Sequence, residues 1–235
     1  MSCSCRKGAK LKNIRSEEIE ELLKALSKNP KAFQLILEVV NSFRPTDDPT
    51  VKAERLFLSV KDMVELQLIK PSQVEQLFKT LRKLLFSKND KERGNLLEVL
   101  VSKLGPFFFK GPYRRVNQCK VFKGNRKLSD KEIDVAFSGK DFLELHECKA
   151  NMVRQWRDPL IKKTKRGSKL HFLNSLPAEC KNGKKVVPVC SGLDGPMAVE
   201  YLKLAFRFYR FKNVKLVGRV ELLSRFESKG KRAFS

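Results

Sequence analysis

The sequence predicts an α/β fold, in which a mixed β-sheet is flanked by helices and an all-helical (all-α) N-terminal domain precedes it. Three observations support this prediction. Apolar residues follow helical spacing through residues 1–88, short apolar runs bounded by turn signals follow residue 105, and helical patterns return between the later runs. An alternation of strands and helices is typical of a sheet with helices packed on its faces.

The first domain is expected to be a bundle of helices. Ser16 precedes the acidic and apolar stretch EEIEELLKAL and would cap its helix. Pro30 would break that helix and start the next, which continues to about Phe43. A third helix is expected over 51–68, and Pro71 suits the first turn of a fourth. Such a bundle could serve substrate choice or oligomerisation.

The second domain is expected over 89–235, with a basic tail, KGKRAFS, at its end. A helix over 92–104 should end at Gly105-Pro106, and further helices are expected within 155–180 and 195–211. Strands are expected in PFFFKG (106–111), VNQCKVF (116–122), EIDVAFSG (132–139), DFLELHECKA (141–150), KKVVPVCSG (184–192) and VKLVGRVEL (214–222).

The charge is strongly positive and uneven. The chain of 235 residues has a formal net charge of +24, from 50 basic and 26 acidic residues. Residues 1–109 hold 20 basic and 14 acidic side chains, whereas residues 110–235 hold 30 and 12. Such a field attracts polyanions, and nucleic acid is favoured over an anionic membrane surface, because no basic amphipathic anchor stands out. No apolar run is long enough to cross a membrane, so we expect no membrane association.

Six cysteines are present, and the N-terminus MSCSCRKGAKLKN lacks the apolar stretch of a secretory signal. A cytoplasmic protein with reduced thiols is therefore expected. Cys3 and Cys5 form a CxC pair, but a metal site would need two further ligands nearby and none is local. The expected structure of this segment is a tail with two free thiols.

The stretch KEIDVAFSGKDFLELHECKAN (131–151) has polar residues where an apolar core should continue. If its two strands pair around Ser138-Gly139, Asp134 and Glu147 come together, and Lys149 shares the face of Glu147. Two carboxylates beside a lysine are costly unless a cation lies between them. A hard divalent ion such as Mg²⁺ fits, because it prefers carboxylate and phosphate oxygens.

Asp134, followed after twelve residues by Glu147-Cys148-Lys149, resembles the PD-(D/E)xK nuclease superfamily. The resemblance covers roughly residues 90–225 and implies a restriction-endonuclease-like core. It implies that Asp134 and Glu147 bind metal and that Lys149 is catalytic. Ile133 stands where the family has its proline. A second ExK triplet, Glu227-Ser228-Lys229, lacks an Asp-bearing strand in front of it.

A further match to Holliday-junction-resolvase-like relatives lies upstream, in Arg93-Gly94-Asn95-Leu96-Leu97-Glu98. The resemblance makes Glu98 an additional acidic metal ligand, with Glu92 as a rival. Each acid also has an ordinary alternative. Asp134 could end a strand or pair with Lys131, Glu147 and Lys149 could form an ion pair at a solvated sheet edge, and Glu98 could be a solvated helix residue.

Basic side chains around the motif are candidates for phosphate contacts. Four fall on one helix face by their spacing, and the others precede the motif; in order along the chain they are Arg114, Arg115, Lys120, Lys123, Lys162, Lys165, Arg166 and Lys169. A merely solvated face is the alternative. His146 lies on the opposite strand face from Glu147 and is expected to be a packing or surface residue rather than a ligand. The aromatic residues between Tyr201 and Phe211 are expected to be core and exposed edge rather than a base-stacking platform.

These observations favour a nuclease that uses Mg²⁺ or Mn²⁺ and metal-activated water to hydrolyse phosphodiester bonds, in DNA rather than RNA. A homodimer is compatible with it, since restriction-like enzymes often pair two active sites. The alternatives are a non-catalytic nucleic-acid-binding protein that retains the nuclease fold, and a basic structural protein whose helical domain binds another protein.

Overall fold

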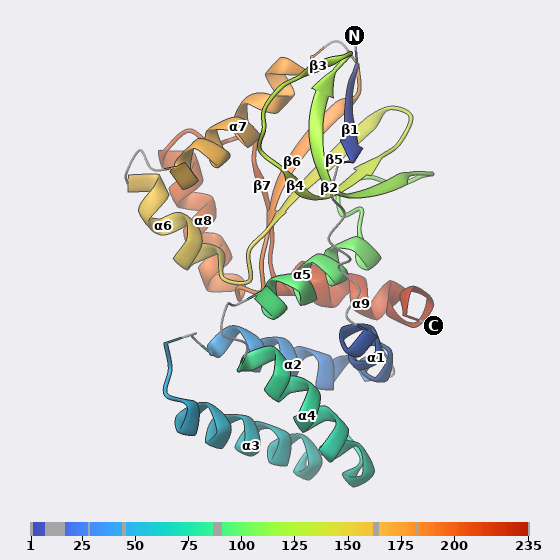
Figure 1. The fold of residues 1–235 in the computed structure, drawn as a ribbon, viewed down its shortest axis with the longest axis vertical. Helices are drawn as coiled ribbons and strands as arrows, with labels where there is room; N and C mark the ends of the chain where they lie inside the picture. Colours follow the sequence, from blue (N-terminus) through green and yellow to red (C-terminus); the bar gives the residue numbers. More distant parts are fainter. Residues whose placement is uncertain are drawn as a thin grey trace.

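A computed structural model describes residues 2–7, 17–27, 29–43, 46–86, 91–161, 165–181 and 183–234. Within these residues seven strands form one mixed sheet (Figure 1). They are β1 (Cys3–Lys7), β2 (Arg114–Lys123), β3 (Arg126–Lys127), β4 (Ile133–Ser138), β5 (Phe142–Cys148), β6 (Lys185–Ser191) and β7 (Lys215–Val217). The order across the sheet is β1-β2-β4-β5-β6-β7, with β3 paired to β2. The α/β class that the sequence predicts is confirmed.

The sheet is antiparallel on one side of β5 and parallel on the other. Strand β4 joins β5 in a hairpin, whereas β6 and β7 run parallel to β5 and are reached through helices. The glycine turn at Ser138-Gly139 lies where the sequence predicts it, since β4 ends at Ser138 and β5 begins at Phe142. Strand β5 therefore lies centrally, and every residue in it is buried.

Helices cover both faces of the sheet, and each face has its own core. One face packs against α6 (Met152–Ile161), α7 (Lys165–Glu179) and α8 (Pro196–Phe208). The other packs against α5 (Lys91–Leu104) and α9 (Arg219–Ala233), beyond which lie α1 (Glu17–Leu26), α2 (Pro30–Ser42), α3 (Pro49–Glu65) and α4 (Val74–Leu85), with a 3-10 turn, η1 (Pro71–Gln73), before α4.

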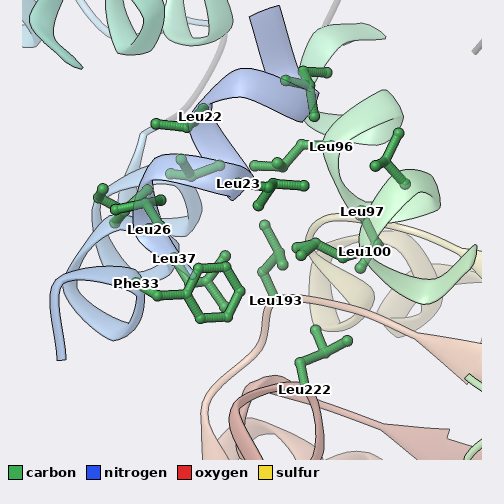
Figure 2. Packing of buried hydrophobic residues seen from close by; sticks show 14 of the residues in the cluster. Leu22, Leu23, Leu26, Phe33, Leu37, Leu96, Leu97, Leu100, Leu193 and Leu222 are labelled. Carbon is green, nitrogen blue, oxygen red and sulfur yellow. The ribbon is translucent and has the colours of Figure 1, made fainter. Parts of the chain in front are cut away.

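The early helices share one core with the sheet layer. Figure 2 shows Leu23 of α1 pointing toward Leu96 of α5. Leu193, from the second half of the chain, lies between Phe33 of α2 and Leu100 of α5, and Leu222 lies below it. The expected breaks between these helices are confirmed: Asn29 caps α2, and Pro30 occupies its first turn. Ser16 lies outside the described residues. A domain division near residue 88 stays a prediction.

The first residues differ from the expectation of a tail with free thiols. Cys3–Lys7 forms the edge strand β1, antiparallel to β2. Cys3 is bonded to Cys180 and Cys5 to Cys119, so four of the six cysteines form disulfides, and Cys148 and Cys190 are buried thiols. The expectation of reduced thiols is wrong for these pairs. Their partners lie 177 and 114 residues away, which no local spacing reveals.

Two expected strands are also wrong. Residues 106–111 are irregular, because the side chain of Glu144 takes the backbone N–H groups of Phe107 and Phe108 that a strand would pair. The last strand ends at Val217, where the backbone N–H of Gly218 donates to Glu221 Oε2 at 2.8 Å and starts α9. The expected basic tail is mostly the end of that helix.

Candidate active site

The β4–β5 hairpin brings the two motif carboxylates together. Val135 pairs with His146, which places Asp134 opposite Glu147 in the register. Asp134 Oδ2 accepts a hydrogen bond from the backbone N–H of Cys148 at 2.7 Å. Lys149 Nζ lies 2.8 Å from Glu147 Oε1 and 3.6 Å from Asp134 Oδ2. The three residues that the motif nominates therefore form one cluster.

The backbone around Lys149 is held by the loop that follows β6. The N–H of Lys149 donates to the carbonyl of Ser191 at 2.9 Å, and the N–H of Leu193 to the carbonyl of Ala150 at 3.0 Å. Buried Asp194 accepts the N–H of Met152 at 2.7 Å, at the start of α6. A Cβ on Gly192 would lie 2.9 Å from the carbonyl oxygen of Lys149, so only glycine permits this approach.

Lys169 is a second lysine of the cluster. Its Nζ lies 2.7 Å from Glu147 Oε2 and also donates to the backbone carbonyl of Glu132. The contact with Glu147 is an ion pair, without the geometry of a hydrogen bond. The sequence predicts Lys169 as a phosphate contact on a helix face, whereas the structure places it against a proposed metal ligand. The contact between Lys169 and Glu147 depends on how α7 packs beside the hairpin, which the sequence does not show.

Glu98, on α5, faces the same cluster. Its Oε2 atom is buried without a hydrogen-bond partner. Burial first, and then the negative charge of Asp134, raise the pKa of Glu98 to about 7, although Lys149 opposes the rise. Glu98 is therefore a partly buried neighbour of this cluster rather than a solvated helix residue. The side chain of its rival Glu92 lies outside the described residues.

The same surroundings alter the other ionisable groups. Burial and the charge of Glu147 raise the pKa of Asp134 to about 6, with Lys149 acting in the opposite direction. For Lys149, burial disfavours the cation, yet Glu147 and Asp134 outweigh it and raise the pKa above its ordinary value. Burial is the larger cause of both raised pKa values and a neighbouring carboxylate the second, so the negative charge of the cluster is only partly offset by Lys149.

That excess charge bears on whether the residues suit a divalent cation. Among the described residues, no three histidine, cysteine or acidic side chains are gathered closely enough to form a ready metal site. The donor chemistry nevertheless fits Mg²⁺ or Mn²⁺, because all three candidates are carboxylates and one buried oxygen of Glu98 has no partner. Lys149 and Lys169 currently hold the two oxygens of Glu147.

Strand β2 has an unusual backbone beside this cluster. Gln118 lies opposite Asp134 in the β2–β4 register and adopts a left-handed conformation, with φ of 48°. Non-glycine residues seldom adopt it, and such strain concentrates at functional sites. The regular ladder is interrupted there, between the pairs Asn117–Val135 and Cys119–Ile133. Nothing in the sequence marks Gln118.

The remaining basic candidates are dispersed. Arg114 and Arg115 begin β2 and pair with Ser138 and Phe137, which lie four and three strand positions from Asp134, or roughly 13 and 10 Å. Arg115 donates to the carbonyl of Ser102 at 2.9 Å, and Lys120 lies 3.9 Å from Asp130. Lys123 is half-buried on β2. Lys162 lies outside the described residues, while Lys165 and Arg166 belong to α7 with side chains that are not described.

His146 packs on the far side of β5, as the alternation predicts. It is fully buried, with Nδ1 2.8 Å from Ser191 Oγ and Nε2 2.7 Å from Glu144 Oε1. Glu144 also accepts the N–H groups of Phe107 at 2.7 Å and Phe108 at 2.9 Å. The order Ser–His–Glu resembles a hydrolytic triad, but burial of all three side chains makes it a structural network.

The second ExK triplet, Glu227 to Lys229, lies on α9 rather than on a strand. Glu227 is exposed, and Lys229 is half-buried. The structure therefore separates two identical sequence patterns, since only the triplet at the end of β5 meets an opposing carboxylate.

No family model matches the chain, and no curated protein matches it at a significant level. Solved structures that match include VC1899 from Vibrio cholerae, with 15% identity, a TM-score of 0.46, and coverage of 100% of this chain and 60% of that one. Can2 from Sulfobacillus thermosulfidooxidans, solved with cyclic tetra-adenylate, has 12% identity, a TM-score of 0.41, and coverage of 100% and 56%. This chain spans less than two thirds of either, and at these values the likeness supports no inference about activity or ligand.

Proposed function

We propose that this protein is a metal-dependent nuclease that hydrolyses phosphodiester bonds, with DNA as the expected substrate. The observation that carries the proposal is the cluster of Asp134, Glu147 and Lys149 at the end of one hairpin, with Glu98 turned toward it. Asp134, Glu147 and Glu98 would hold Mg²⁺ or Mn²⁺. When bound, the metal supplies a Lewis acid that polarises the phosphate and lowers the pKa of a bound water.

The chain's own residues would divide the remaining work. Lys149 stays protonated beside two carboxylates, which suits it to donate hydrogen bonds to charge building on the phosphate oxygens rather than to remove a proton from water. Lys169 would keep Glu147 oriented. The excess positive charge of residues 110–235 would hold the polyanion near the site and make binding depend on salt.

Cleavage tests this directly. Purified protein is incubated with Mg²⁺ or Mn²⁺ and supercoiled, linear, single-stranded and branched DNA, and RNA. Asp134→Asn and Lys149→Met should each lower the cleavage rate by a factor of about 100 or more, since the first removes a ligand of the proposed metal and the second a positive charge that would stabilise the transition state. Glu227→Gln and Lys229→Met are matched controls in the second ExK triplet and should cleave like the wild type.

Each result decides between functions. Metal-dependent cleavage that is lost only in the β-hairpin variants supports the nuclease. Equal cleavage by all variants would reveal a contaminant or another site and refute it. Salt-sensitive DNA binding without cleavage of any substrate would favour the alternative, a non-catalytic nucleic-acid-binding protein, which the basic surface also suits. Neither binding nor cleavage would favour a basic structural protein that binds another protein.

A further inference from the structure

Helix α8 carries apolar side chains on two opposite faces. Val199, Leu202 and Phe206 are buried against the sheet. On the opposite side Met197 is 88% exposed and Phe208 79%, and Tyr201 and Leu204 between them are at least half exposed. A helix that is apolar on both faces is normally covered on both. The aromatic residues here divide as the sequence predicts, into core and exposed edge, but the exposed edge is a continuous stripe.

The exposed stripe has the spacing of a helix-pairing seam. Its members, Met197, Tyr201, Leu204 and Phe208, are separated by four, three and four residues, which is the alternation of d and a positions in a heptad. The stripe runs for about 16 Å along the helix. It exposes on the order of several hundred Å², an area that marks interaction sites on soluble proteins.

The residues beside the stripe indicate what covers it. Glu200 and Arg207 occupy the two g positions on one side, and Ala198 and Ala205 the two e positions on the other. In an antiparallel pair of identical helices, each Glu200 would face Arg207 of the second copy, and the alanines would face each other and let the backbones approach. A parallel pair would set Glu200 against alanine. The pattern is therefore self-complementary about a two-fold axis.

We propose that α8 forms the interface of a homodimer, in which two copies of the stripe pack antiparallel and two Glu200–Arg207 ion pairs flank the seam. The proposal is independent of the nuclease proposal. Glu200 already pairs within its own helix with Lys203 at 2.6 Å, and both side chains are exposed enough to rearrange. A standard interface buries about 800 Å² per partner, and this stripe would form its apolar centre.

The oligomeric state tests the proposal. Sedimentation velocity of the full chain, over a range of concentrations, should show a species of twice the 27.1 kDa chain mass. Leu204→Arg should raise the dimer Kd by a factor of about 100 or more, because the two-fold axis introduces the charge twice into the seam. Leu58→Arg is the matched control, since Leu58 is a 48% exposed leucine on α3, which lies on the other side of the sheet from α8, and it should leave the dimer unchanged.

A charge exchange tests the orientation without touching the apolar seam. Glu200→Arg and Arg207→Glu should each raise the Kd by a factor of about 3–10, and the double variant should return it toward the wild-type value. Unchanged circular dichroism spectra would show that the variants fold. A wild type that stays monomeric, a dimer indifferent to Leu204→Arg, or single and double charge variants that behave alike would each overturn the proposal. Binding of the monomer to anionic lipid vesicles through the stripe would also overturn it.

Discussion

Glu144 and Glu147 lie three residues apart on β5 and both are buried, but their carboxylates have different surroundings. The carboxylate of Glu144 accepts hydrogen bonds from His146 and from two backbone N–H groups. Burial disfavours its charge, but these hydrogen bonds outweigh burial and lower its pKa. Glu147 points to the other face of β5, at the end of the hairpin, where it lies among the carboxyl groups of Asp134 and Glu98, both of which have raised pKa values. A buried carboxylate whose hydrogen bonds are all made stabilises the fold. Several buried carboxyl groups whose negative charge lysines offset only in part are instead suited to bind a cation.

Matched amide substitutions should separate these two roles most strongly. Glu144→Gln should lower the free energy of unfolding by about 3 kcal/mol, because the amide cannot accept from Phe107, Phe108 and His146 together. Glu147→Gln should change it by less than about 1 kcal/mol, since Asp134 still accompanies Lys149 and the carbonyl of Glu132 still accepts from Lys169, yet should abolish metal-dependent cleavage. Urea titration and the cleavage assay measure both. Equal stability losses would contradict the division of roles.

A smaller effect should appear in the pH dependence of stability without metal. The pKa of Glu98 is about 7 in the folded protein and 4.5 ordinarily, so the folded form binds the proton more tightly. Its stabilising contribution is complete below about pH 4.5 and is lost as pH rises through 7. Between pH 5 and 8 this should cost about 1–2 kcal/mol after allowance for its partial exposure.

Glu98→Gln should remove that dependence and leave the protein more stable than wild type at pH 8. Glu98→Asp retains a carboxyl group and controls for the substitution itself. Thermal unfolding over the pH range provides the measurement. If Glu98→Gln and wild type keep parallel pH profiles, then the carboxyl group is not the source of the excess charge.

The smallest effect concerns Mg²⁺. At ten times its Kd the ion should stabilise the folded protein by about 1.4 kcal/mol, which appears as a raised Tm. The rise should be greater at pH 8 than at pH 5.5, because protons compete for Asp134 and Glu98. Asp134→Asn should lose the rise, and Glu227→Gln should keep it. A rise that survives in Asp134→Asn would locate the ion elsewhere.

The sequence predicts the hairpin and its motif well, because local spacing and the two-residue alternation of strands place Asp134, Glu147 and Lys149 together. It cannot show that Lys169 reaches Glu147, since that contact depends on how α7 crosses the sheet. The sequence also cannot predict the left-handed backbone of Gln118, because it occurs where the ladder between β2 and β4 is interrupted. Within the described residues none of the helices has the length and apolar character to cross a membrane.

The edge strand β1 has a consequence for dissecting the molecule. Because Cys5 is bonded to Cys119, the chain between them forms a covalent ring that contains α1 to α5. A single proteolytic cut among these helices would leave both fragments joined until a reductant is added. A truncation that begins at residue 89 would also delete a strand and two disulfides of the sheet that it was meant to isolate. A deletion variant that keeps Cys3–Lys7 and joins it through a linker to α5 would instead remove α1 to α4 and leave the sheet complete.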